Sequence, residues 1–82
     1  MPEDATEEKT LSYGEKAVGL SFNPSGDGKV QDLKEKAAAF IDACNQLREE
    51  STDGEVKRMA SVAITEAQTA QMWAVKAATW QA

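Results

Sequence analysis

The segment from Glu55 to about Trp80 is apolar on more than one side of a helix, and this feature limits what the chain can fold into. Alanines recur in steps of 3 and 4 residues, the spacing of one helical face, at positions 60, 63, 67, 70, 74 and 77. A second apolar set is expected to point elsewhere and consists of Val62, Ile64, Met72 and Val75. A helix with two apolar sides needs more than one neighbour.

A first helix is predicted over residues 29–50. Its apolar residues follow one helical face and are Val30, Leu33, Ala37, Phe40, Ile41, Cys44 and Leu47. Asp27 and Ser25 are candidate N-caps. A short turn follows, and the spacing of Thr52 and Glu55 is typical of a capping box. The second helix is therefore predicted over residues 53–80, antiparallel to the first, in an all-α two-helix hairpin.

The chain before the hairpin divides into two parts. Residues 1–10 carry four acidic side chains within the first eight positions and predict a disordered acidic tail. Residues 11–28 hold four of the five glycines, and Gly14 and Gly19 are expected to break any helix. This stretch also contains Leu11, Tyr13, Val18, Leu20 and Phe22. We therefore expect residues 11–28 to form an ordered arm that packs on the helices.

A single domain of 82 residues is small, and a hairpin of two helices cannot bury both sides of its second helix. Domains of this size are usually stabilised by disulfides, a metal or oligomerisation. The chain has one cysteine and no histidine, which argues against the first two. We therefore predict a homo-oligomer, and closed symmetric assemblies are the default.

Composition also argues against several functions. With a net charge of −5, the chain is not expected to bind DNA or RNA polymers, because phosphate contacts require cations. No apolar run is long enough to predict a membrane span. Histidine, the commonest general base, is missing, and Cys44 lies on the apolar side of the first helix. We expect neither an enzyme nor a bound metal or cofactor.

The arm and the basic residues suggest a ligand instead. Bases stack on aromatic rings such as Tyr13 and Phe22, and phosphates bind Lys and Arg. A small phosphorylated nucleotide is thus chemically accommodated. In the alternative interpretation, the two rings only anchor the arm, and the protein is a structural or adaptor oligomer without a ligand. That alternative predicts that both rings are buried within the protein.

Two segments resemble a known family. Residues 13–26, YGEKAVGLSFNPSG, and residues 63–78, AITEAQTAQMWAVKAA, are similar to the hairpin-domain proteins of phages that inhibit the bacterial CBASS and Thoeris defences. The resemblance covers about residues 11–80. It implies helical hairpins assembled into homo-oligomers, typically hexamers, in the cytoplasm of the infected bacterium. Such proteins bind cyclic dinucleotides such as cyclic GMP-AMP, and some bind cyclic trinucleotides or cyclic ADP-ribose isomers, without cleaving them.

The resemblance also implies residue roles. Tyr13 matches a family tyrosine that stacks on the ligand, and Lys34 matches a lysine of the same pocket, with Lys29 and Lys36 as alternatives. Arg58 is the nearest match to an arginine that binds cyclic trinucleotides. The Phe22–Pro24 turn departs from the better-known anti-CBASS members, which leaves the preferred ligand open. Further candidate contacts are Lys16, Phe22, Asn23, Ser25 and Thr65.

Overall fold

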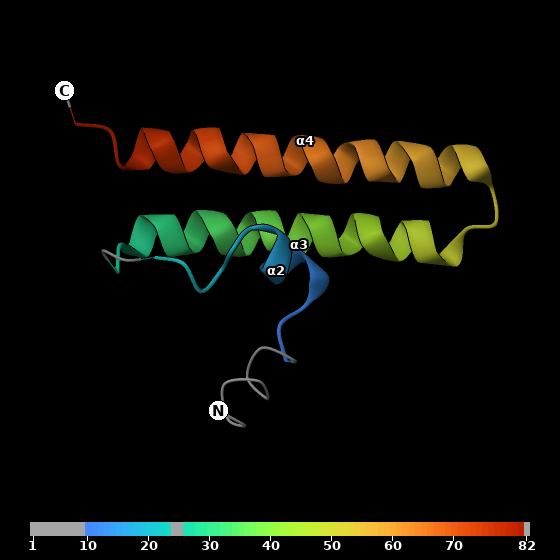
Figure 1. Cartoon of the computed structure of the whole chain (residues 1–82), viewed down its shortest axis with the longest axis horizontal. Coiled ribbons are helices and arrows are strands. Elements are labelled where there is room, and N and C mark those ends of the chain that lie inside the picture. Colours follow the sequence, from blue (N-terminus) through green and yellow to red (C-terminus); the bar gives the residue numbers. More distant parts are fainter. Residues whose placement is uncertain (1–9, 24–25, 82) are drawn as a thin grey trace.

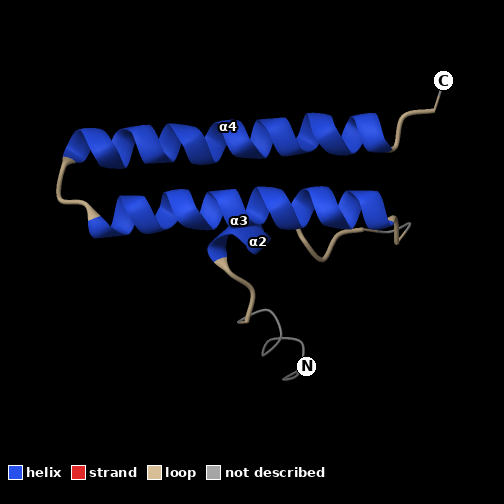
Figure 2. Cartoon of the chain, turned by 180° about the vertical axis from the view of Figure 1, so that it is seen from behind, coloured by secondary structure: helices blue, strands red, loops and turns tan. Residues whose placement is uncertain are grey.

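The computed structural model describes residues 10–23 and 26–81, which contain three helices and no strand. The short helix α2 spans Tyr13–Ala17, α3 spans Gly28–Glu50 and α4 spans Gly54–Ala78. Helices α3 and α4 lie antiparallel and side by side, and α2 packs on α3 (Figures 1 and 2). The prediction of an all-helical hairpin is confirmed.

Aspartates begin both long helices. Asp27 is the N-cap of α3, and its carboxylate accepts the Lys29 N–H at 2.8 Å. Asp53 is the N-cap of α4 and accepts the Glu55 N–H at 2.8 Å. The capping box expected from Thr52 is therefore wrong, because the neighbouring aspartate accepts the Glu55 N–H and adds a negative charge where the helix dipole favours it. Helix α4 ends at Ala78, so Trp80 lies beyond it.

The arm contains a helix that the glycine spacing did not predict. Ser12 and Glu15 form a reciprocal capping box, with bonds of 3.1 and 2.9 Å between side chain and backbone, which stabilises the first turn of α2. Gly14 is buried within that helix, and its N–H donates to Asp42 Oδ1 of α3 at 2.7 Å. The expectation that Gly14 breaks a helix is wrong, whereas Gly19 has a left-handed φ of 63° and follows α2.

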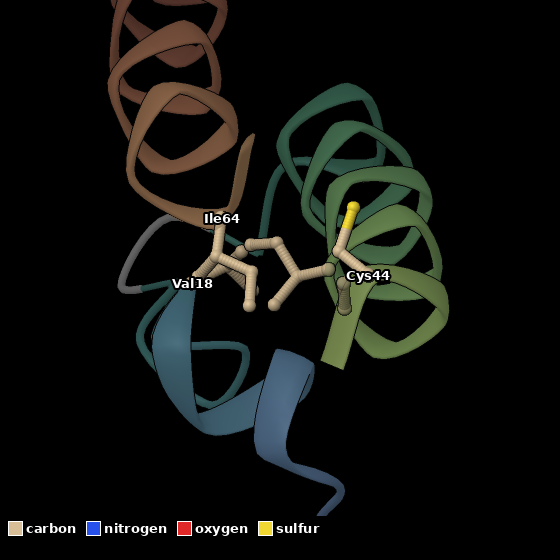
Figure 3. Packing of buried hydrophobic residues seen from close by; sticks show 5 residues of the cluster. Val18, Cys44 and Ile64 are labelled. Atoms are coloured by element: carbon tan, nitrogen blue, oxygen red, sulfur yellow. The ribbon is translucent and has the colours of Figure 1, made fainter. Parts of the chain in front are cut away.

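The hydrophobic core joins the arm to both long helices (Figure 3). Val18 from the arm packs with Ala38, Ile41 and Cys44 of α3 and with Ile64 of α4. Ile41 is the one fully buried side chain in the described part of the chain. The expectation that Ile64 points away from the hairpin is wrong, since it is 3 % exposed. It lies one position after Ala63, and the core is wide enough to take both.

Two side chains fasten the arm by hydrogen bonds to its carbonyl groups. Lys34 Nζ donates to the Gly19 carbonyl at 3.0 Å and also to the Phe22 carbonyl. From α4, Gln68 Nε2 donates to the Ala17 carbonyl at 3.3 Å. The prediction that the arm packs on the helices is confirmed. Lys34 itself is only 5 % exposed, although lysine is usually a surface residue.

Apolar side chains remain exposed on both long helices. Phe40 and Leu47 were expected on the packed side of the first helix but are 54 % and 57 % exposed, because the arm covers a different side of α3. The exposed apolar side chains on and just after α4 are Met59, Val62, Met72, Trp73 and Trp80. Within the second apolar set of α4, Val62 and Met72 are thus not covered by α3 or the arm, whereas Ile64 is buried. Among the described helices, none has both the length and the hydropathy of a membrane span.

Replacing Gly14 by alanine is expected to detach α2 from α3. A Cβ at this position would lie 2.2 Å from the Ala38 carbonyl oxygen and 2.8 Å from Asp42 Oδ1, and the first is backbone that cannot yield. Overpacking of this kind costs about 1–3 kcal/mol. Denaturant unfolding at a fixed protein concentration should show that loss. Gly28→Ala is the control, because its Cβ would meet nothing within 4 Å. Equal stabilities of the two variants would contradict the close approach.

Candidate ligand-binding site

The exposed Tyr13 ring is the first candidate feature, and the local backbone fixes where it lies. Tyr13 is the first residue of α2, between the Ser12 cap and the anchored Gly14. Its side chain is 46 % exposed, and the Arg48 guanidinium carbon lies over the ring, 5.4 Å from the centroid. This distance is within the range of a cation–π contact. One side of the ring therefore faces a cation from α3.

Neutral groups hold the Arg48 guanidinium. Nη1 donates to Ser61 Oγ of α4 at 3.1 Å, and Nη2 donates to Asn45 Oδ1 at 2.7 Å. Ser61 in turn donates to the Lys57 carbonyl at 2.9 Å, and Lys57 Nζ donates to the Arg48 carbonyl at 2.8 Å. Within residues 10–23 and 26–81, both salt bridges lie elsewhere. Arg48 is thus oriented without a carboxylate that would neutralise it.

A second cluster forms around Lys34 and Phe22. The Lys34 ammonium lies 5.5 Å from the centroid of the Phe22 ring, in addition to its two bonds to the arm, and the ring is 72 % exposed. Fourteen residues separate Lys34 from Arg48, which is about 21 Å along a helix. Within one chain the structure therefore does not bring Tyr13 and Lys34 together. Each belongs to a separate aromatic–cation cluster.

Arg58 lies in an exposed ion pair at the beginning of α4. Its Nη2 is 2.5 Å from Glu55 Oε2. The hydrogen bond from Arg58 lowers the pKa of Glu55, and the same bond raises the pKa of Arg58. Both groups are charged at neutral pH, so a ligand at Arg58 has to compete with Glu55. An exposed pair of this kind contributes little to stability and can exchange partners.

The remaining predicted site residues lie on the arm and on α4. Lys16 of α2 and Thr65 of α4 are exposed. Asn23 closes the loop before α3, since its side-chain nitrogen donates to the Asp27 carbonyl at 3.0 Å and its oxygen accepts the Asp27 N–H at 3.2 Å. Ser25 lies outside the described residues. Over the described part of the chain, acidic and cysteine side chains form no group suited to a metal ion.

Comparison with known protein families matches residues 15–79 to the model described as the Acb2/Tad1 hairpin domain. The match spans most of the chain and both long helices. The chain belongs to this family. Its members are the anti-CBASS and anti-Thoeris sponge proteins, a group known for sequestering ligands and not for catalysis. Neither a curated protein nor a solved structure gives a significant match to the chain.

Sequence reasoning missed Arg48 as a candidate site residue. Arg48 is 35 residues from Tyr13 in the sequence, and their contact depends on how α2 crosses α3. The helical spacing could have indicated one of its partners, because Asn45 and Arg48 are three residues apart and therefore neighbours on one face of the helix. It could not reveal Ser61, which joins this face from the other helix.

Lys34→Met is expected to loosen the arm between Gly19 and Phe22. The substitution removes the ammonium that bonds both carbonyl groups and keeps an apolar stem of similar length. The Phe22 amide, which donates to the Gly19 carbonyl, should exchange faster with deuterium in mass-spectrometric measurements. The control is Lys36→Met, since Lys36 pairs with Asp32 on the exposed side of α3. Unchanged exchange in Lys34→Met would show that the arm is held by its apolar contacts alone.

Proposed function

We propose that the protein sequesters cyclic oligonucleotide immune messengers without cleaving them. Cyclic dinucleotides such as cyclic GMP-AMP are the principal candidates, followed by cyclic trinucleotides and cyclic ADP-ribose isomers. The observation that carries this proposal is the exposed Tyr13 ring beneath an Arg48 guanidinium that no described carboxylate neutralises. In a chain of the sponge family, this pairing has the chemistry of a nucleotide site.

The chemistry of the cluster fits a base next to a phosphate. Stacking of a base on an aromatic side chain is worth about 1–3 kcal/mol. Hydrogen bonds between a cation and a phosphate contribute about 1.5–3 kcal/mol each. Arg48 lies over one side of the Tyr13 ring, so each chain offers one ring face to a base. A dinucleotide with two bases would then use the rings of two protomers.

We assign the site residues to distinct roles. Tyr13 stacks on the base, while Lys16, Lys34 and Arg58 approach phosphates. Because Lys34 and Tyr13 lie in separate clusters of one chain, a pocket that contains both combines two protomers. The further contacts in this proposal are Phe22, Asn23, Ser25 and Thr65. Binding of Lys34 to a phosphate also requires its ammonium to reorient while it keeps part of its contact with the arm.

A homo-oligomer, with a hexamer as the expected form, supplies that second protomer. Exposed apolar side chains such as Trp73 and Met72 on α4 and Phe40 on α3 favour association, because their burial releases water from apolar surface. The proposed place of action is the cytoplasm of the infected bacterium. Sequestration needs no catalytic group there, because the bound messenger only has to be kept from the host effector.

The ligand proposal is tested by calorimetric titration with cyclic GMP-AMP, cyclic di-AMP, cyclic tri-AMP and a cyclic ADP-ribose isomer. We expect tight binding of at least one of them, and one molecule of a dinucleotide per two protomers. Chromatography of the heat-released ligand should return it unchanged. Binding followed by recovery of a cleaved ligand would contradict sequestration. No binding across the panel would favour the structural or adaptor oligomer, although that alternative expects buried rings and both are exposed here.

Tyr13→Ala is expected to weaken binding of the dinucleotide about five- to a hundredfold, which corresponds to the loss of one stacking contact. Tyr13→Phe keeps the ring and should retain most of the affinity. Both titrations are to be run on proteins with unchanged sedimentation. Equal affinities of Tyr13→Ala and the unmodified protein would show that the base does not stack on this ring.

The oligomer proposal is tested by sedimentation equilibrium. The unmodified protein should have a mass several times the 8.9 kDa of one chain. Trp73→Glu places a charge among the exposed apolar side chains of α4 and should shift the equilibrium towards monomer. Trp80→Glu is measured for comparison, because Trp80 lies beyond the end of α4 and its effect on the mass shows whether the interface extends that far. A monomer at all concentrations for the unmodified chain would contradict the proposal.

A further inference from the structure

The Arg48 guanidinium lies over the Tyr13 ring and has no ion-pair partner among the described residues. Building on the proposed function, we infer that Arg48 is the charge-bearing residue of the Tyr13 site: it holds the ring from one side and attracts a ligand phosphate to the edge of the same ring. This role rests on three observations. They are its neutral hydrogen-bond partners, its place over an exposed aromatic ring and the different surroundings of the other cations.

The partners of Arg48 orient the guanidinium and leave its charge intact. An arginine has five N–H donors in a planar group, and the bonds to Ser61 and Asn45 use one on each terminal nitrogen. Ser61 comes from α4 and Asn45 from α3, so the plane of the guanidinium is fixed against both long helices. The remaining donors are suited to a phosphate, which arginine binds with two parallel hydrogen bonds.

Three other cations, Arg58, Lys36 and Lys34, have partners that a ligand must displace. Arg58 is paired with Glu55 at 2.5 Å, and Lys36 is paired with Asp32 at 2.5 Å. The Lys34 ammonium is buried against carbonyl groups of the arm. Arg48 needs no such exchange, because its acceptors are a hydroxyl and an amide. An incoming phosphate would therefore gain the full interaction with a preformed donor.

Two acidic side chains, Glu15 and Asp42, accept backbone N–H groups on either side of Tyr13. Glu15 accepts the Ser12 N–H at 2.9 Å, and Asp42 accepts the Gly14 N–H at 2.7 Å. These bonds hold both carboxylates against α2, and neither carboxylate is ion-paired with Arg48. The anchoring of α2 thus depends on the same two acidic residues.

The test compares Arg48→Met with Arg48→Lys in titrations of the panel nucleotide that the unmodified protein binds most tightly. Arg48→Met is expected to weaken binding at least tenfold and to reduce its dependence on salt, because one phosphate contact is lost. Arg48→Lys keeps the charge and should retain the salt dependence with an intermediate affinity. The control is Lys76→Met, which also removes one positive charge. Lys76 is about 22 Å along α4 from Ser61, and its ammonium lies over the Trp73 ring.

A second readout needs no ligand. Tyr13 is the only tyrosine, so the ring signals of a tyrosine-labelled sample report on this site alone in NMR spectra. Arg48→Met should shift these signals in the free protein, and Ser61→Ala, which removes one acceptor but no charge, should shift them less. If Arg48→Met fails to fold, Ser61→Ala serves for the titration too, with an expected loss of affinity of about threefold or more.

The outcomes separate the two proposals. If the unmodified protein binds no panel nucleotide, the proposed function fails. If it binds while Arg48→Met keeps the affinity and the salt dependence of the unmodified protein, only the role of Arg48 is overturned. A loss of affinity that Lys76→Met reproduces would also overturn it, because general charge would then account for the effect. Loss of affinity with altered tyrosine signals and unchanged sedimentation is the result that supports the inference.

Discussion

The contact between Gly14 and α3 is the constraint on which the rest of the structure depends. The backbone of α2 approaches Ala38 so closely that even a methyl group on Gly14 would clash with the carbonyl. This approach places Val18 in the core between the two long helices and brings Tyr13 over Arg48. Two helices alone form a thin layer with one shared face, and the arm provides the third side that encloses Ile41. Core and candidate site therefore share one anchoring contact.

The periodicity of the sequence was sufficient to predict the hairpin but not to predict which side of each helix is buried. Apolar residues of α3 occupy two adjacent sides, and the buried one runs through Val30, Lys34, Ala38, Ile41 and Cys44. A hydropathy pattern predicts that the lysine in that row, Lys34, is exposed to solvent. Its burial depends on the carbonyl groups of an arm that lies 12 to 15 residues away in the sequence. Conversely, the pattern predicted that Phe40 and Leu47 are packed, whereas both are exposed.

The candidate site was predictable to a similar extent. Tyr13 and Phe22 stand out because aromatic rings are scarce in the chain and both lie in the arm. Their cation partners do not stand out, since Arg48 and Lys34 are two of nine basic residues. Only the packing of the arm on α3 pairs each ring with its cation. Family resemblance pointed to Lys34 as a pocket residue, whereas the structure adds that its ammonium is already engaged within the chain.

An acidic chain can still present a cationic site, because binding responds to the charges near the ligand more than to the total. Charges separated by more than about 10 Å are largely screened at physiological salt. In the described part of the chain, the carboxylates of Asp32 and Glu55 pair with lysine or arginine on their own helices, whereas Arg48 is bonded to a hydroxyl and an amide. The net charge of −5 then discourages binding of long polyanions. The proposed ligand, a small cyclic nucleotide, needs only the local donors, so the proposal does not require a chain that is basic overall.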